Sequence, residues 1–217
     1  MNILTKLLDL LYPPRCILCR KLLQDTENGV CRACRKTLRT VPVSEQRRDI
    51  QRIELCAAPF HYEGAVRESL LRYKFHGVTA YARVYADFIA KSIDENLISC
   101  DSITWVPLSK KRLRRRGYDQ AQILAEELAK KLELPCERLL IKQRDTRPQS
   151  SMDSAEKRKT NASGAYICSE GMDLRGRTVL LVDDIVTTGA TMSECAKQLK
   201  AAGCKAVYGA AAASRSN

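Results

Sequence analysis

Two adjacent carboxylates follow four apolar residues in the C-terminal part of the chain. Val179–Val182 predicts a buried strand, and Asp183 and Asp184 come directly after it. In open α/β sheets, ligands bind at the carboxyl ends of the strands. Neighbouring carboxylates at a buried strand end destabilise a fold unless something compensates them. The pair therefore indicates a binding site for ribose hydroxyls and for Mg²⁺ carried by a pyrophosphate.

A turn rich in threonine and glycine follows the carboxylates and opens a predicted helix, Ala190–Ala201. The first N–H groups of a helix and its positive dipole end suit a phosphate monoester. Glycine lets the backbone approach such a phosphate, and threonine hydroxyls add donors. A strand, a turn and a threonine cap without a ligand is the alternative, but the neighbouring carboxylates favour a sugar phosphate. The candidate phosphate-binding residues are Thr187, Thr188, Gly189, Ala190 and Thr191.

A basic run follows a second predicted strand, Ile103–Pro107, and contributes to a net charge of +12. That charge favours anionic partners without choosing among them. The first part of the run suits a pyrophosphate leaving group, and the second part suits nucleic acid. A solvated basic face is the third possibility. The candidate pyrophosphate residues are Ser109, Lys110, Lys111 and Arg112, and the candidate nucleic-acid contacts are Arg114, Arg115 and Arg116.

Four cysteines near the N-terminus have the paired spacing of a tetrahedral zinc site: Cys16, Cys19, Cys31 and Cys34. A set of four thiolates predicts a closed, structural Zn²⁺. So small a segment cannot bury much of a core, so the metal would supply most of its folding free energy. The cations around it fit nucleic acid, or simply solubility. The six remaining cysteines are predicted to be core residues.

The pattern of elements predicts a parallel α/β domain over residues 53–217, preceded by a zinc-ribbon module over residues 1–42. The module begins with an amphipathic helix at Asn2–Leu11, and Val41–Arg52 is predicted to be a linker. The other predicted elements are strands Leu55–Tyr62 and Ala206–Ala212 and helices Ala65–Tyr73, Tyr81–Ile93 and Tyr118–Leu132. The polar segment Gln143–Ser163 predicts a functional lid or, alternatively, a surface loop. We expect a cytoplasmic protein without membrane insertion, since we find neither a signal peptide nor an apolar stretch of ~20 residues.

The run Val-Leu-Leu-Val-Asp-Asp-Ile-Val-Thr-Thr-Gly-Ala-Thr resembles the phosphoribosyl pyrophosphate (PRPP) motif of type I phosphoribosyltransferases. With Arg116-Gly-Tyr-Asp-Gln-Ala121, Thr146-Arg-Pro-Gln149, Arg158-Lys-Thr-Asn161 and the cysteine module, the whole chain resembles the competence-associated ComF family. The resemblance implies that Asp183 and Asp184 contact the ribose hydroxyls and that Thr187–Thr191 cradle the 5′-phosphate. It also implies that Arg147 and Gln149 lie on a flexible loop that closes over the pyrophosphate.

Two functions follow from the resemblance. The first is transfer of a phosphoribosyl group from Mg-PRPP to an unidentified nitrogen acceptor, with release of pyrophosphate. In purine-salvage relatives a carboxylate stands where Thr187 stands here, which argues against a purine acceptor that depends on that carboxylate. The second is a weakly catalytic or non-catalytic protein that binds PRPP or nucleotide. Such a protein would handle single-stranded DNA in natural transformation, with other DNA-uptake proteins as partners.

Overall fold

A parallel sheet forms the centre of the molecule in the computed structural model, which describes residues 13–46, 50–144 and 164–215. The strand order is β1 (Cys56–Ala57), β7 (Ala206–Ser214), β6 (Thr178–Val186) and β3 (Ser102–Trp105), and β2 (Phe60–His61) also pairs with β7. Every pairing in this sheet is parallel. The predicted parallel α/β fold is therefore confirmed.

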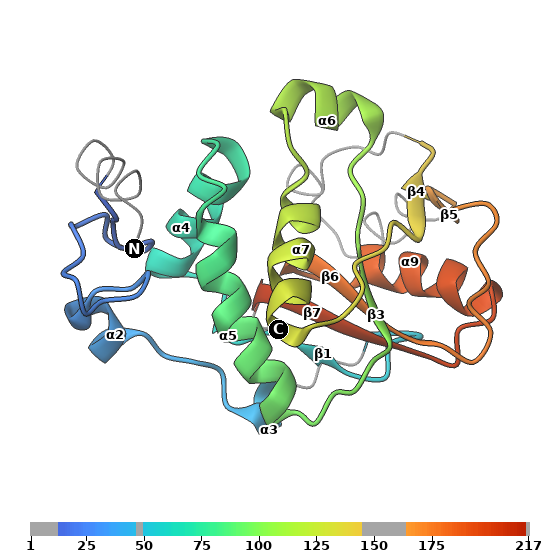
Figure 1. The fold of residues 1–217 in the computed structure, drawn as a ribbon, viewed down its shortest axis with the longest axis horizontal. Coiled ribbons are helices and arrows are strands. Elements are labelled where there is room, and N and C mark those ends of the chain that lie inside the picture. The colour runs from blue at the N-terminus through green and yellow to red at the C-terminus, as the bar shows by residue number, and fades with distance from the viewer. Residues whose placement is uncertain (1–12, 47–49, 145–163, 216–217) are drawn as a thin grey trace.

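Helices cover both faces of the sheet (Figure 1). They are α4 (Gly64–Phe75), α5 (Tyr81–Glu95), α7 (Gln120–Leu132) and α9 (Ala190–Ala201). Alternate residues of β6 enter different cores: Leu180 and Val182 join the core beside α5 and α7, whereas Val179 and Leu181 join the core beside α9. Because both faces are buried, the strand reads as a continuous apolar run.

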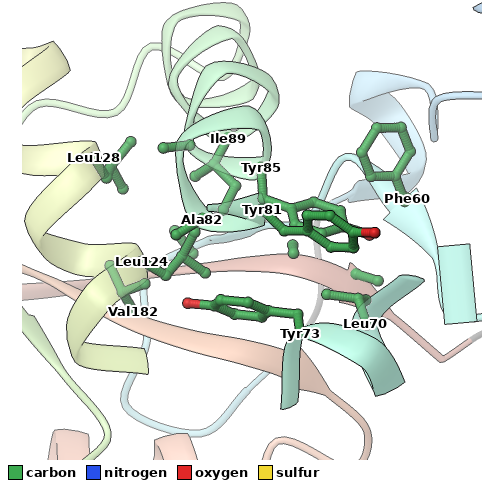
Figure 2. Packing of buried hydrophobic residues seen from close by; sticks show 14 of the residues in the cluster. Phe60, Leu70, Tyr73, Tyr81, Ala82, Tyr85, Ile89, Leu124, Leu128 and Val182 are labelled. Atoms are coloured by element: carbon green, nitrogen blue, oxygen red, sulfur yellow. The ribbon is translucent and has the colours of Figure 1, made fainter. Parts of the chain in front are cut away.

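The first core is rich in aromatic rings (Figure 2). Tyr73 and Tyr85 are fully buried, and their ring centroids are 6.4 Å apart. The Tyr73 hydroxyl donates a hydrogen bond of 2.5 Å to the carbonyl of Gln120, at the start of α7. A buried hydroxyl needs such a partner. This bond ties the last turn of α4 to α7.

Several elements differ from those expected. The predicted strand Leu55–Tyr62 is broken into β1 and β2 because Pro59, between them, has no N–H for the ladder. Two short strands were not predicted, β4 (Leu140–Lys142) and β5 (Tyr166–Cys168), which form a separate antiparallel pair. The basic run was expected to follow β3 as a loop, but most of it forms helix α6 (Lys110–Arg116).

The described residues of the stretch that joins the cysteine module to the sheet are packed against the rest of the protein. It contains the short helix α3 (Val43–Gln46), and the buried Gln46 side chain donates to the carbonyl of Val41 and accepts from Asn96 in the turn after α5. Val41 and Ile50 are buried as well. The predicted linker therefore contributes buried residues to the fold. The predicted helix Asn2–Leu11 lies outside the described residues.

The cysteine module packs against α4 and α5, at the side away from the sheet (Figure 1). Its only described helix is α2 (Arg32–Thr37). Cys16, Ile17 and Val30 belong to the same core as α5. Among the described residues, no helix combines the length and the apolar character needed to cross a bilayer.

Candidate functional site

The acidic pair lies where one side of β6 loses its neighbouring strand. The pairing of β3 with β6 ends at Trp105 and Val182, whereas β6 stays paired with β7 as far as Val186. Asp183 and Asp184 are therefore inside the last part of β6, beyond the end of β3. The strand is longer than predicted because β7 continues to hydrogen-bond to it. This is the carboxyl edge of a parallel sheet, where α/β proteins bind ligands.

Asp184 is buried and forms an ion pair that sequence reasoning missed. The Lys74 ammonium, from the last turn of α4, lies 2.8 Å from Asp184 Oδ2. Burial alone would raise the pKa of Asp184, but the Lys74 charge outweighs it and holds the pKa below its ordinary value. The same pair raises the pKa of Lys74 against the effect of burial. Asp184 is therefore a carboxylate at neutral pH.

Asp183 has a different environment from its neighbour. Its side chain is partly exposed, and its Oδ1 accepts a hydrogen bond of 2.8 Å from the Asp184 N–H. Burial first, and the adjacent Asp184 charge second, raise the pKa of Asp183 well above its ordinary value. Of the two carboxyl groups, Asp183 is the more accessible to a ligand. A bound cation or hydroxyl donors would offset the cost of its ionisation.

The turn after β6 places Gly189 at the mouth of α9. Gly189 has a φ of 71°, in the left-handed region, and it is the N-cap of α9, where it has no side chain of its own to act as a cap. A Cβ at Gly189 would also come within 2.8 Å of Ile50 Cγ1. Ile50 therefore packs closely against Gly189, and the predicted contact of Gly189 with a phosphate stays a prediction. Thr188 is exposed, and its hydroxyl lies 3.4 Å from the Ala190 N–H.

The basic run is organised by a helix with conventional ends. The Ser109 hydroxyl caps α6 by accepting from the Arg112 N–H, and Gly117 ends it in the left-handed region at a φ of 84°. Both residues were visible in the sequence as helix signals. Because Ser109 is buried and serves as a cap, its hydroxyl has a structural role, and its binding role stays a prediction.

The cations of α6 that we assigned to two different ligands, pyrophosphate and nucleic acid, do not occupy two separate places. Lys110, Lys111, Arg114 and Arg115 together line an open pocket of about 1000 Å³ beside β4 and β5. No residue of β6 or α9 lines this pocket. Lys142, a buried lysine that was not predicted, lies in the same wall and donates a 2.9 Å hydrogen bond to Tyr166. One pocket thus contains residues that we had assigned to pyrophosphate and to nucleic acid.

Arg116, the last residue of α6, contacts Phe75 and Gln120 and does not line this pocket. Its guanidinium lies 5.0 Å from the centre of the Phe75 ring and donates to the side chain of Gln120. Burial lowers the pKa of Arg116, and the charge of Asp184 opposes that change. Asp119 caps the next helix, α7. Its carboxylate also accepts a hydrogen bond of 2.8 Å from the Leu108 N–H. Asp119 therefore fixes the segment between β3 and α6.

The four predicted zinc ligands come together. The Sγ atoms of Cys16, Cys19, Cys31 and Cys34 all lie within 4.8 Å of one another, and those of Cys19 and Cys31 are 3.6 Å apart. Sulfurs on a tetrahedral zinc with bonds of about 2.3 Å would be ~3.8 Å apart. Burial opposes ionisation of Cys16, but hydrogen bonds from the backbone of Cys31, Cys19 and Leu18 lower its pKa to about 7. Such donors stabilise a metal-bound thiolate.

Two predicted residues lie outside the described part of the chain. They are Arg147 and Gln149, together with most of the predicted lid Gln143–Ser163. Thr187 and Thr191 are described, and both are partly exposed at the turn before α9 and in its first turn. The remaining cysteines split as follows: Cys56, Cys195 and Cys204 are buried, and Cys100, Cys136 and Cys168 are partly exposed.

Comparison with known families matches two models to the chain. Residues 118–216 match the phosphoribosyl transferase domain, and residues 7–48 match the double zinc ribbon domain. The first match contains β6, the acidic pair and α9, and the second contains the four-cysteine cluster. In the described residues this cluster is the one group of metal-binding side chains found.

Three similar proteins illustrate the relationship. Competence protein F of Haemophilus influenzae is 28% identical over 87% of this chain and 92% of its own length. Competence protein ComFC of Streptococcus pneumoniae is 31% identical over 69% of this chain and 64% of its own. The DNA utilization protein YhgH of Escherichia coli K12 is 33% identical over 49% of this chain and 46% of its own. The matches to the second and third proteins thus leave a third or more of those proteins unmatched.

A solved structure with a similar arrangement is the glutamine PRPP amidotransferase from Bacillus subtilis, complexed with ADP and GMP. It is 20% identical over 66% of this chain and 30% of its own, with a TM-score of 0.46. So partial an overlap adds no argument to the assignment. The sheet, the acidic strand and the family models define a type I phosphoribosyltransferase-like α/β protein with an N-terminal structural zinc ribbon. The similarity to competence protein F and to ComFC supports the predicted relationship to the ComF family.

Proposed function

We propose that the chain binds Mg-PRPP at the carboxyl edge of β6 and transfers its phosphoribosyl group to a nitrogen acceptor. The observation that carries this proposal is the position of the acidic pair. Asp183 and Asp184 lie past the end of β3, and the same segment leads directly into α9, whose N-cap is a glycine. Carboxylates for ribose hydroxyls and a helix N-terminus for a phosphate thus come from one continuous stretch.

Each group has a role that follows from its charge and position. Asp183 and Asp184 accept hydrogen bonds from the ribose hydroxyls. The N–H groups and hydroxyls of residues 187–191 hold the 5′-phosphate. Ser109, Lys110, Lys111 and Arg112 would contact the pyrophosphate, together with Arg147 and Gln149, which lie outside the described residues. Mg²⁺ enters with the pyrophosphate, since Mg²⁺ in such sites is held largely by substrate phosphates and water.

The reaction exchanges one bond at C1 of the ribose for another. The bond from C1 to the pyrophosphate oxygen breaks, and its electron pair leaves with the pyrophosphate. A nitrogen lone pair of the acceptor then forms the new bond to C1, and the nitrogen releases its proton to solvent. Positive charge develops on the ribose ring between these events, and an ionised carboxylate of the acidic pair would stabilise that charge. The cations of α6 would neutralise the leaving group.

A second function is favoured by a specific observation: Lys110, Lys111, Arg114, Arg115 and Lys142 line one pocket away from β6. Such a cluster provides sequence-independent contacts to the phosphates of a single strand. The similar proteins named for competence and for DNA utilization point the same way. In this version the chain binds PRPP or a nucleotide, turns it over weakly or not at all, and holds single-stranded DNA on the basic pocket.

Release of pyrophosphate from Mg-PRPP, measured with a panel of nitrogen bases, tests the first function. We expect release that depends on one class of base and that is lost in Asp183→Asn. Exposed Asp173 on the far side of the sheet domain, changed to Asn, serves as the matched control and should leave release unchanged. Absence of release with every base, together with salt-sensitive binding of single-stranded DNA, would favour the second function instead.

A further inference from the structure

The last turn of α4 contacts both the four-cysteine module and the acidic pair, Asp183 and Asp184. Arg72 Nη2 donates hydrogen bonds of 2.8 Å and 2.9 Å to the carbonyls of Ile17 and Leu18. These two carbonyls lie between Cys16 and Cys19, in the tight turn that presents one pair of zinc ligands. Arg72 is only partly exposed, so these bonds are shielded from competing water. The guanidinium therefore holds the end of α4 against this turn, Cys16–Cys19, which we call the zinc knuckle.

The opposite side of the same turn carries Lys74. Residues two apart on an α-helix point in nearly opposite directions, about 200° apart. Arg72 accordingly reaches the cysteine module, while Lys74 reaches the sheet and lies 2.8 Å from Asp184 Oδ2. One helical turn thus joins the knuckle to the carboxylate of the acidic pair.

Tyr73, between them, keeps this turn from shifting independently. Its side chain is fully buried, and its hydroxyl donates to the carbonyl of Gln120. The backbone carbonyl of Tyr73 accepts a hydrogen bond of 2.6 Å from the Tyr118 hydroxyl. That hydroxyl also accepts a hydrogen bond from the Gly77 N–H. Figure 2 shows the Tyr73 ring reaching from α4 toward Leu124 and Val182, next to the acidic pair in sequence. Tyr73 therefore ties the middle of this turn to α7.

We propose that this turn of α4 couples the zinc module to the phosphoribosyl site, with Arg72 as its anchor and Lys74 as the positioning residue of Asp184. The zinc module has two states, folded with its metal and unfolded without it, because a module of this size folds only around its metal. When the knuckle loses its metal, Arg72 loses two fixed acceptors and the end of α4 frays at its C-cap, His76. Lys74 then leaves Asp184, and the buried Asp184 carboxylate, beside the partly exposed Asp183, remains without its cation.

The coupling is tested first without any ligand, by amide hydrogen exchange of the full chain with zinc bound. Arg72→Met should speed exchange about 10-fold in peptides covering residues 72–76 and 182–186, and leave β7 unchanged. Arg72→Lys should give an intermediate effect, because an ammonium can reach one carbonyl. Arg67→Met is the matched control, since Arg67 lies at the other end of α4 and pairs with Glu68 on the surface. Wild-type exchange in Arg72→Met with full zinc content would overturn the proposal.

The second arm measures affinity for Mg-PRPP and rests on the proposed function. Chelation of zinc from the wild type and the Arg72→Met change should each weaken binding about 10-fold. Chelation of zinc from the Arg72→Met protein should add little, because both changes break the same link. Fully additive losses would overturn the coupling. If the wild type binds no Mg-PRPP, the proposed function fails, while the exchange results still decide the coupling.

Discussion

Asp183 and Asp184 are adjacent in the sequence, yet their surroundings give them opposite contributions to stability. Burial and the neighbouring charge raise the pKa of Asp183, so its ionised form destabilises the fold. Lys74 overrides burial and lowers the pKa of Asp184, so the ionised form of that residue stabilises the fold. An acidic pair in which one carboxylate is costly to ionise is consistent with the proposed binding site.

Urea unfolding of Asp183→Asn and Asp184→Asn at neutral pH tests this difference. Asp183→Asn should raise the free energy of unfolding, because it removes a carboxylate that is costly to ionise. The gain should vanish as the pH falls toward about 4, where the unfolded wild-type residue also takes up a proton. Asp184→Asn should cost about 2–3 kcal/mol, because it leaves the partly buried Lys74 without its partner. Equal effects of the two changes would contradict this assignment.

Lys74→Met should change the pH dependence of Mg-PRPP binding. In the wild type, Asp184 has a depressed pKa and stays ionised across the neutral range. Without the lysine, burial raises that pKa, so as the pH falls binding should begin to weaken at a higher pH than in the wild type. Lys74→Arg keeps the charge and corrects for titration of the ligand itself. Parallel pH profiles for the Met and Arg variants, measured by calorimetry, would rule out this role for Lys74.

At the scale of elements, the segment from β6 into α9 could be predicted well, and its surroundings could not. The apolar run and the Thr/Gly turn indicated the strand and the helix, and α9 has the predicted bounds Ala190–Ala201. Lys74 was missed because its contact with Asp184 spans 110 residues of sequence, and no local pattern selects one lysine among many. The β4–β5 pair was missed because three-residue strands carry too little periodicity.

Substitutions at Gly189 and Ile50 test whether glycine is needed at position 189 for packing, for phosphate binding, or for both. Gly189→Ala should destabilise the protein by about 1–2 kcal/mol, since alanine disfavours a positive φ and its Cβ would meet Ile50. Ile50→Ala in the same chain should relieve the contact, leaving the backbone strain. If the turn cradles a phosphate, the double variant should still bind Mg-PRPP more weakly than Ile50→Ala alone. Equal affinity of those two proteins would limit Gly189 to packing.

The basic helix α6 should contribute to the binding of single-stranded DNA if the second function holds. Arg114→Gln with Arg115→Gln removes two exposed cations from the pocket and leaves the Ser109 cap in place. The slope of log affinity against log salt should then fall by ~1.4, since each phosphate contact to a single strand contributes ~0.7. Arg175→Gln, at an exposed site on the other side of the domain, is the control. An unaltered slope would exclude α6 from the contact.

At the scale of the whole molecule, the cysteine module is a part of the core rather than an appendage. Its residues Ile17 and Val30 join the cluster around α5, and Gly29 has a φ of 66° where its Cα approaches Val84. The sequence indicated the zinc ligands from their spacing alone. It could not show how the module packs, because those contacts involve single apolar residues scattered along α4 and α5.

Cys16→Ser should remove about one zinc per chain and unfold the module. Because the module shares a core with α5, the sheet domain should also lose stability, seen as a lower thermal midpoint. Cys100→Ser, outside the cluster, is the control and should keep its zinc. Full metal content in Cys16→Ser by mass spectrometry of the intact protein would refute the site. An unchanged midpoint of the sheet domain would refute the shared core.

The whole account depends on recognition of a phosphorylated ribose by the edge of β6, and calorimetric titration of Mg-PRPP into the intact zinc-bound protein tests it most directly. We predict saturable binding at one site per chain, and loss of that heat in Asp183→Asn, a change expected to leave the fold intact. Binding of equal affinity in Asp183→Asn, or no binding to the wild type, would contradict the account.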